Sequence, residues 1–116
     1  MIYCVIYIEH DYNYKLYHLE RSNIVDVKLF SDLKSAENYI AKQIFKYINN
    51  MEDILYDIAS SEKKYFNIVD YRYLEIKEEY KNDYNLAKTL SDNYCKNEFG
   101  KPLFSYEIHE SNINPA

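Results

Sequence analysis

The spacing of apolar residues changes near position 31, and this change constrains the fold more than any other feature. Residues 2–9 (IYCVIYIE) are rich in β-branched and aromatic side chains with strand-like alternation. From Leu33 onward, apolar residues recur at three- and four-residue steps, which is the spacing of one helix face. The chain therefore groups strands first and helices afterwards, which is typical of an α+β domain.

Three strands are predicted before position 31. Residues 2–9 are apolar on both faces and are expected to lie centrally in a sheet. A turn at 11–14 leads to a second strand at 15–20, and Ser22-Asn23 form a second turn. A third strand follows at 24–30, so the three strands form an antiparallel meander.

Helices are predicted next, with Ser31 as the N-cap of the first one. Asn49-Asn50 is the weak point at which residues 31–59 form either one helix or two. Residues 65–75 are ambiguous between strand and helix. The predicted apolar stripe consists of Leu33, Ala36, Ile40, Ile44, Ile48, Met51, Leu55 and Ile58.

The helical step returns from about position 74 and is expected to end at Gly100, with Pro102 beyond it. A last strand is predicted at 103–110. The apolar positions of this second helical segment are Ile76, Tyr80, Tyr84, Ala87, Leu90 and Tyr94.

The predicted order is β-β-β-α-(α)-α-β. It indicates a two-layer α+β fold with a mainly antiparallel sheet of about four strands and helices packed on one face. Residues 1–111 are expected to form a single domain. Residues 112–116 are expected to be a polar tail.

The composition argues against several classes of protein. The chain has 116 residues and a net charge of −5, and its arginines are Arg21 and Arg72, so nucleic-acid binding is unlikely. No run of about 18 apolar residues predicts a membrane span, and no secretory signal is recognised. We therefore expect an intracellular protein in which Cys4 and Cys95 are reduced thiols.

Cofactor chemistry is not expected either. With Gly100 as its single glycine, the chain has no glycine-rich phosphate-binding loop. If residues 11–14 form the turn, Tyr7 lies opposite His18, and His10 and His18 point to opposite faces of the sheet. We therefore predict no metal site, no cofactor and no catalytic residue.

One enzyme-like arrangement is kept as an alternative. If the last strand pairs with the first, an acidic rim would gather around two histidines at one sheet edge. Its members would be His10, His109, Glu9, Asp11 and Glu110.

The chain contains fifteen tyrosines. Tyr, Asn, Ile and Lys have A/T-rich codons, so genomic composition is one explanation. The other is a binding surface, because tyrosine is enriched in interface hot spots and exposed aromatic patches mark partner sites. The candidate partner-binding residues are Tyr3, Tyr7, His18, Tyr71, Tyr73, Tyr80 and Tyr84.

The two ends of the chain show a resemblance. The segments IEHDYN, KLFSDLKSAENYI and FSYEIHESNIN look like parts of small uncharacterised accessory proteins of large DNA viruses (giant viruses) and phages. The matching residues at the helix start are Phe30, Ser31, Ala36, Glu37, Tyr39 and Ile40. The resemblance implies a small accessory protein that acts by binding.

The leading hypothesis is a non-enzymatic protein-interaction module that binds or inhibits a host factor or serves as a subunit of a viral complex. Homo-oligomerisation through the same surface is a variant. A small-ligand or nucleotide binder that uses tyrosine stacking is the second hypothesis. An enzyme built on the acidic-histidine rim is the third.

Overall fold

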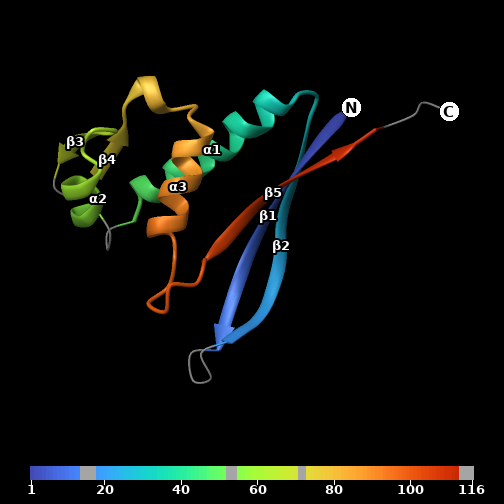
Figure 1. Cartoon of the computed structure of the whole chain (residues 1–116), viewed down its shortest axis with the longest axis horizontal. Coiled ribbons are helices and arrows are strands. Elements are labelled where there is room, and N and C mark those ends of the chain that lie inside the picture. The colour runs from blue at the N-terminus through green and yellow to red at the C-terminus, as the bar shows by residue number, and fades with distance from the viewer. Residues whose placement is uncertain (14–17, 52–54, 71–72, 113–116) are drawn as a thin grey trace. The chain divides into compact units, whose positions relative to one another are not determined.

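The computed structural model describes residues 1–13, 18–51, 55–70 and 73–112 (Figure 1). Contacts within the chain form two compact units, which we describe separately. The sheet unit consists of Met1–Glu37 and Cys95–Ala116, and the helical unit consists of Asn38–Tyr94.

The predicted α+β class is confirmed, since the chain combines helices with strands that pair antiparallel. The elements are β1 (Ile2–Asn13), β2 (His18–Phe30), α1 (Leu33–Asn49), α2 (Leu55–Ser61), β3 (Phe66–Asp70), β4 (Tyr73–Ile76), the 3-10 helix η2 (Glu78–Tyr80), α3 (Tyr84–Tyr94) and β5 (Phe104–Ser111).

Three strands form the sheet unit, in the order β2-β1-β5. Both pairings are antiparallel, and Figure 1 shows β1 between its two neighbours. The prediction that the first strand is central is confirmed, and the last strand pairs with it, which was the condition set for the acidic-histidine rim. The remaining two strands, β3 and β4, form a separate hairpin in the helical unit.

The hairpin between β1 and β2 corrects the predicted meander. The segments 15–20 and 24–30 are not separate strands: β2 continues from His18 to Phe30. Ser22 and Asn23, the predicted turn, lie within the ladder opposite His10 and Glu9. Pairing with β1 overrides their local turn preference, because an antiparallel ladder supplies hydrogen-bond partners to the backbone at every second residue pair.

The register of this hairpin also differs from the prediction. Asn13 pairs with His18, so the connection falls within residues 14–17, which lie outside the described residues. Tyr7 consequently pairs with Asp26 and not with His18. A later turn shifts every cross-strand partner, because the register follows from the position of the turn.

One face of the sheet carries buried aromatic and aliphatic side chains. Val5 is 1% exposed and Phe104 is 7% exposed. Tyr7 stacks on Tyr106, its cross-strand partner, with ring centroids 4.9 Å apart. The Tyr7 hydroxyl donates a hydrogen bond to Glu9 at 3.0 Å. We call this side of the sheet the aromatic face.

Helix α1 begins at a different cap from the predicted one. Asp32, not Ser31, precedes the first helical residue, and Asp32 Oδ1 accepts the backbone N–H of Ser35 at 2.8 Å. A carboxylate in this position satisfies a backbone N–H that has no partner within the helix. The hydrogen bonds from the backbone and side chain of Ser35 lower the pKa of Asp32 below its usual range.

The predicted stripe of α1 is buried along most of its length. Helix α1 ends at Asn49, and the Asn50 side chain donates to the carbonyl of Lys46 at 2.8 Å. Residues 31–59 therefore form two helices that separate at the predicted weak point. Leu33, at the start of the stripe, is 40% exposed. The buried members of the stripe are Ala36, Ile40, Ile44, Ile48 and Ile58.

The ambiguous segment 65–75 forms the hairpin of β3 and β4. Phe66 and Leu74 are 3% and 2% exposed and anchor its two strands. The prediction that a helix starts at about position 74 was therefore wrong. Helix α3 begins at Tyr84. Asp83 Oδ1 accepts the backbone N–H of Leu86 at 3.0 Å and caps α3.

Gly100 does not end a helix as predicted, because α3 ends at Tyr94. Gly100 has a φ of 76° in a turn where its N–H donates to the Asn97 carbonyl at 3.0 Å. A positive φ is accessible to glycine without steric cost.

Candidate functional site

The face of the sheet opposite the aromatic face is the most unusual surface of the described residues. Directly paired residues of neighbouring strands project to the same face. The pairing register therefore assigns side chains of all three strands to this face, which we call the open face. Its members are Ile2, Cys4, Ile6 and Ile8 from β1; Ile24, Val27 and Leu29 from β2; and Ser105, Glu107, His109 and Ser111 from β5.

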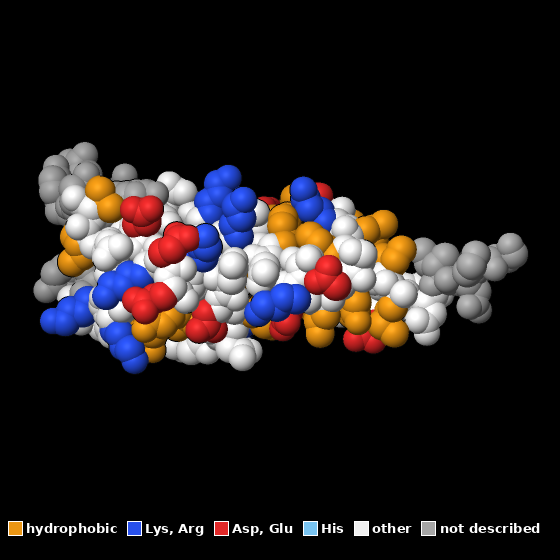
Figure 2. Space-filling view, turned by 90° about the horizontal axis from the view of Figure 1, so that it is seen from above, with side chains coloured by type: hydrophobic (Ala, Val, Ile, Leu, Met, Phe, Trp, Pro, Cys, Tyr) orange, Lys and Arg blue, Asp and Glu red, His pale blue; other side chains and the backbone are white. Residues whose placement is uncertain are grey.

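The aliphatic side chains on β2 are exposed to solvent. Ile24 and Leu29 are each 66% exposed, and Val27 is 50% exposed. The open-face side chains of β1 are half-buried. Contiguous apolar patches of this kind are uncommon on monomeric proteins and mark interaction sites. In the view of Figure 2, several hydrophobic side chains lie together on the right, whereas charged side chains of both signs are mixed over the left.

A polar row crosses the three strands at one end of the open face. The His10 ring lies between two serines, with Nδ1 2.8 Å from the Ser22 hydroxyl and Nε2 2.7 Å from the Ser105 hydroxyl. A histidine beside a serine is the start of a nucleophilic dyad, but an orienting carboxylate is usual at the other ring nitrogen. Here that nitrogen faces Ser22, so the row ties the strands together and forms a polar border.

An acid and a base lie on the β5 side of the open face. His109 Nε2 is 3.0 Å from Glu107 Oε2, and both side chains are at least half exposed. They occupy positions i and i+2 of one strand, so both project to the same face. The open face therefore has an aliphatic centre on β1 and β2 and an acid-base pair on β5.

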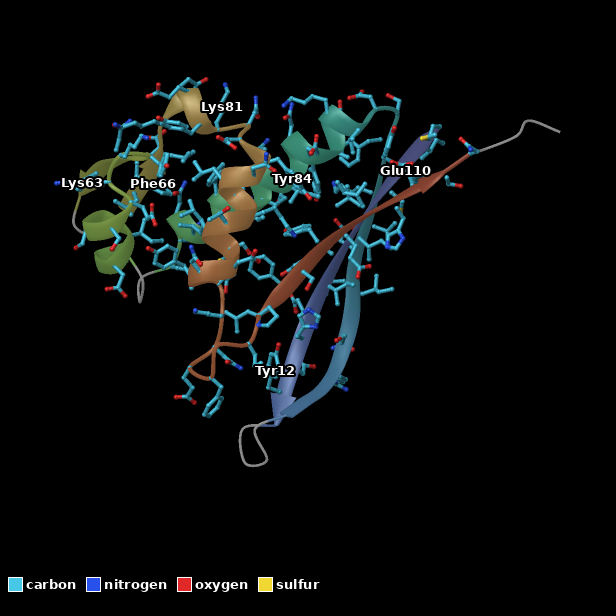
Figure 3. The ribbon with its side chains drawn as sticks, viewed as in Figure 1. Tyr12, Lys63, Phe66, Lys81, Tyr84 and Glu110 are labelled. Carbon is cyan, nitrogen blue, oxygen red and sulfur yellow. The ribbon has the colours of Figure 1, made fainter. Side chains whose placement is uncertain are left out.

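The predicted acidic-histidine rim does not assemble. His109 pairs with Cys4, six residues along β1 from His10, which corresponds to about 20 Å of strand. Glu110 pairs with Tyr3 at the same distant end. Figure 3 shows the labelled residues Glu110 and Tyr12 near opposite ends of the sheet. The antiparallel register separates these groups, although the two strands do pair.

Asp11, another predicted member of that rim, forms hydrogen bonds with side chains of β2 instead. Its carboxylate accepts hydrogen bonds from Arg21 Nε at 2.8 Å and from the Asn23 amide at 3.0 Å. The hydrogen bond from Arg21 holds the pKa of Asp11 below its usual range, and the bond from Asn23 adds to this effect. A carboxylate that is kept ionised by partners across the hairpin is unsuited to general-acid work near neutral pH.

The predicted partner-binding tyrosines are divided between the two units. Tyr3 and Tyr7 are half-buried on the aromatic face. Tyr80 is in the helical unit, where its ring meets that of Tyr65 edge-on at 4.9 Å, and Tyr84 begins α3. Tyr71 lies outside the described residues. For Tyr73 and His18 the structure gives the strand positions alone, opposite Asp70 and Asn13 respectively.

The pKa of Tyr94 is raised above its ordinary value. Its hydroxyl donates to Glu62 Oε1 at 3.2 Å within the helical unit. Burial is the main cause of the raised pKa of Tyr94, and the nearby carboxylate of Glu62 raises it further. The hydroxyl therefore stays protonated near neutral pH and serves as a structural hydrogen-bond donor.

A cavity of about 310 Å³ lies within the helical unit. Lys42 and Lys46 stand one turn apart on α1 beside the buried ring of Phe45. The buried Oδ1 of Asn49 at the cavity accepts no hydrogen bond. The residues that line the cavity are Lys42, Phe45, Lys46, Asn49, Asn50, Glu75, Ile76, Glu78 and Lys81, so none of its described lining is tyrosine.

The described residues contain neither a metal-binding cluster nor a membrane-crossing helix. In that part of the chain, no three His, Cys, Asp or Glu side chains gather as a metal site would require. None of the described helices has the length and apolar character needed to cross a lipid bilayer. Cys4 is half-buried on the open face, and Cys95 is buried.

No family model, curated protein or solved structure matches this chain.

Sequence reasoning missed the aliphatic residues of β2 as candidate site residues. The signal was present in IVDVKLF (24–30), which is as apolar as the strand at 2–9. That pattern predicts a strand but does not distinguish a central strand from an edge strand. In the sheet, β2 is an edge strand.

Proposed function

We propose that this protein is a protein-interaction module and that the open face is its contact surface. The observation that carries the proposal is the row formed by Ile24, Val27 and Leu29, each at least half exposed on one side of one strand. Burying such side chains against a partner releases them from water at about 25 cal/mol per Å². The partner has a matching surface, aliphatic in the centre with an acid and a base beside it.

This proposal changes the residues of the predicted interface but keeps the predicted class of function. Tyr3 and Tyr7 belong to the aromatic face, which is already occupied by ring contacts within the chain. The β2 side chains Ile24, Val27 and Leu29 of the open face are each at least half exposed. A role as an intracellular viral accessory protein remains a prediction.

Site-specific photo-cross-linking in the native cell tests this function. A benzophenone amino acid replaces Val27 on the open face, and a control variant carries it at Asp26, which faces the opposite side of the same strand. We expect a discrete adduct from position 27 and none from position 26. The proposal fails if position 27 gives no adduct or if both positions give the same adducts.

The cavity supports ligand binding as a second candidate function. The three lysines of the lining outnumber its two carboxylates, Glu75 and Glu78, so the cavity carries a surplus of positive charge. Phe45 supplies an apolar surface, and the buried oxygen of Asn49 can accept a hydrogen bond. This set fits a small anion with an apolar body and a donor group, such as a nucleoside monophosphate. Calorimetric titration with adenosine monophosphate should show binding that Lys46→Ala weakens, and no heat in the unchanged protein would contradict this candidate.

A further inference from the structure

We infer that the partner of the open face is a second copy of this chain, packed face to face about a two-fold axis. This inference rests on the proposed function of the open face. It depends on the order of side chains along the three strands, because a symmetric dimer requires a surface that is complementary to itself.

The register places the open-face residues in matched rows. Leu29, Cys4 and His109 form one row across β2, β1 and β5. Val27, Ile6 and Glu107 form the next open-face row. Between them lies the row through Val5, whose side chains project to the aromatic face.

The two-fold axis would run across the three strands, directly over Val5. Rotation about this axis would bring the Leu29 row of one copy over the Val27 row of the other copy. Leu29 of one copy would lie over Val27 of the other, and Cys4 would lie over Ile6. On β5, each His109 would lie over the Glu107 of the second copy. Aliphatic groups therefore meet aliphatic groups and the acid meets the base, which favours specific pairing over repulsion.

In the rows farther from the axis, matching residues of the two copies would also meet. Ile8 would exchange with Ile2, and Ser105 with Ser111, because each pair is equidistant from the Val5 row. The hydrogen-bonded row of His10, Ser22 and Ser105 then borders the contact, where polar groups remain near water.

The size of the open face sets the expected strength of the dimer. The eight residue pairs between β1 and β5 span about 27 Å, and three strands span about 15 Å, so each copy offers about 400 Å². Two copies together bury about 800 Å², which is the size of a weak, transient interface. We therefore expect a reversible dimer with a dissociation constant in the micromolar range.

Sedimentation equilibrium of the full chain across this concentration range tests the inference. We expect a monomer-dimer equilibrium. Val27→Asp should raise the dissociation constant at least about tenfold, because it buries an unpaired carboxylate. The control Val69→Asp makes the same change on β3, where the side chain is similarly exposed at 56%, and it should leave the equilibrium unchanged.

An exchange of the acid and the base tests the two-fold axis. Glu107→His alone places histidine over histidine and removes the acid from the contact, so it should weaken the dimer. Adding His109→Glu restores an acid over a base and should recover the original dissociation constant. A different protein on the open face would not tolerate this exchange, so failure of the double variant to recover association overturns the symmetric arrangement.

The two proposals can fail separately. A purified chain that stays monomeric, together with a specific adduct to another protein from position 27, would overturn the second copy and leave the interaction function intact. A monomer with no adduct from position 27 would overturn both. Circular dichroism of every variant distinguishes lost association from lost folding.

Discussion

The aliphatic side chains of α1 and β2 are of the same types but differ greatly in exposure. Ile40, Ile44 and Ile48 of α1 are at most 1% exposed, whereas Ile24 and Leu29 of β2 are 66% exposed. The α1 stripe contributes to the folded chain by leaving water. The β2 row remains available for a contact that the single chain does not make.

Two apolar rows of similar composition can therefore differ in whether they are buried in the folded chain. A helix stripe at 3.6-residue spacing gathers its side chains on one buried side. In a strand, backbone pairing and side-chain burial are independent, so β2 completes its ladder with β1 while its open-face side chains stay in water.

The largest expected effect tests whether the two rows differ in their contribution to folding. Ile44→Ala should lower the free energy of unfolding by about 2–5 kcal/mol, because it leaves a cavity in a packed region. Ile24→Ala should change it by about 0.5 kcal/mol or less, as is usual for exposed positions. Urea denaturation of dilute protein measures both. Equal losses would show that the β2 row is buried in the folded monomer.

A smaller effect is expected at the polar border of the open face. Ser105→Ala removes the part-buried hydroxyl next to His10 Nε2 and should lower the free energy of unfolding by about 1 kcal/mol. Ser22→Ala removes the more exposed contact at Nδ1 and should cost less. Thermal denaturation at fixed pH compares the two variants. The border would be unimportant for folding if neither variant differed from the unchanged chain.

The smallest effect concerns pH and the outer part of the hairpin. Asp11 has a lowered pKa in the folded chain, so its ionised form favours folding. This contribution is complete above the ordinary aspartate pKa of about 4 and is lost as the pH falls through the lower folded value. The stability difference between the unchanged chain and Asp11→Asn should therefore shrink toward zero in strong acid. Urea denaturation across the acid range measures this difference, and a difference independent of pH would contradict the role of ionisation.

Much of the fold could be predicted from the period of apolar residues. The central strand and the buried positions Ile40, Ile44 and Ile48 follow from spacings of two and of three to four. The hairpin register did not follow, because Ser22 and Asn23 have turn propensity but lie in a ladder. The segment 65–75 was undecided because short apolar runs suit both strand and helix.

The candidate site was less predictable than the fold. The tyrosines Tyr7 and Tyr106 attract attention by residue type, yet they stack on each other within the sheet unit. Val27 attracts none, because valine is ordinary in strands. Val27 is a candidate contact residue because its side chain is exposed. That exposure depends on which elements cover each face of the sheet.

The sequence by itself determined the α+β class, the central first strand and the helical stripe, because side-chain periodicity is a local property of the backbone. Only the tertiary structure decided that His10 and His109 lie far apart and that Glu107 and His109 share a face with the aliphatic row of β2. These relations depend on the register between strands distant in sequence, and a shift of one residue would move every side chain to the other face.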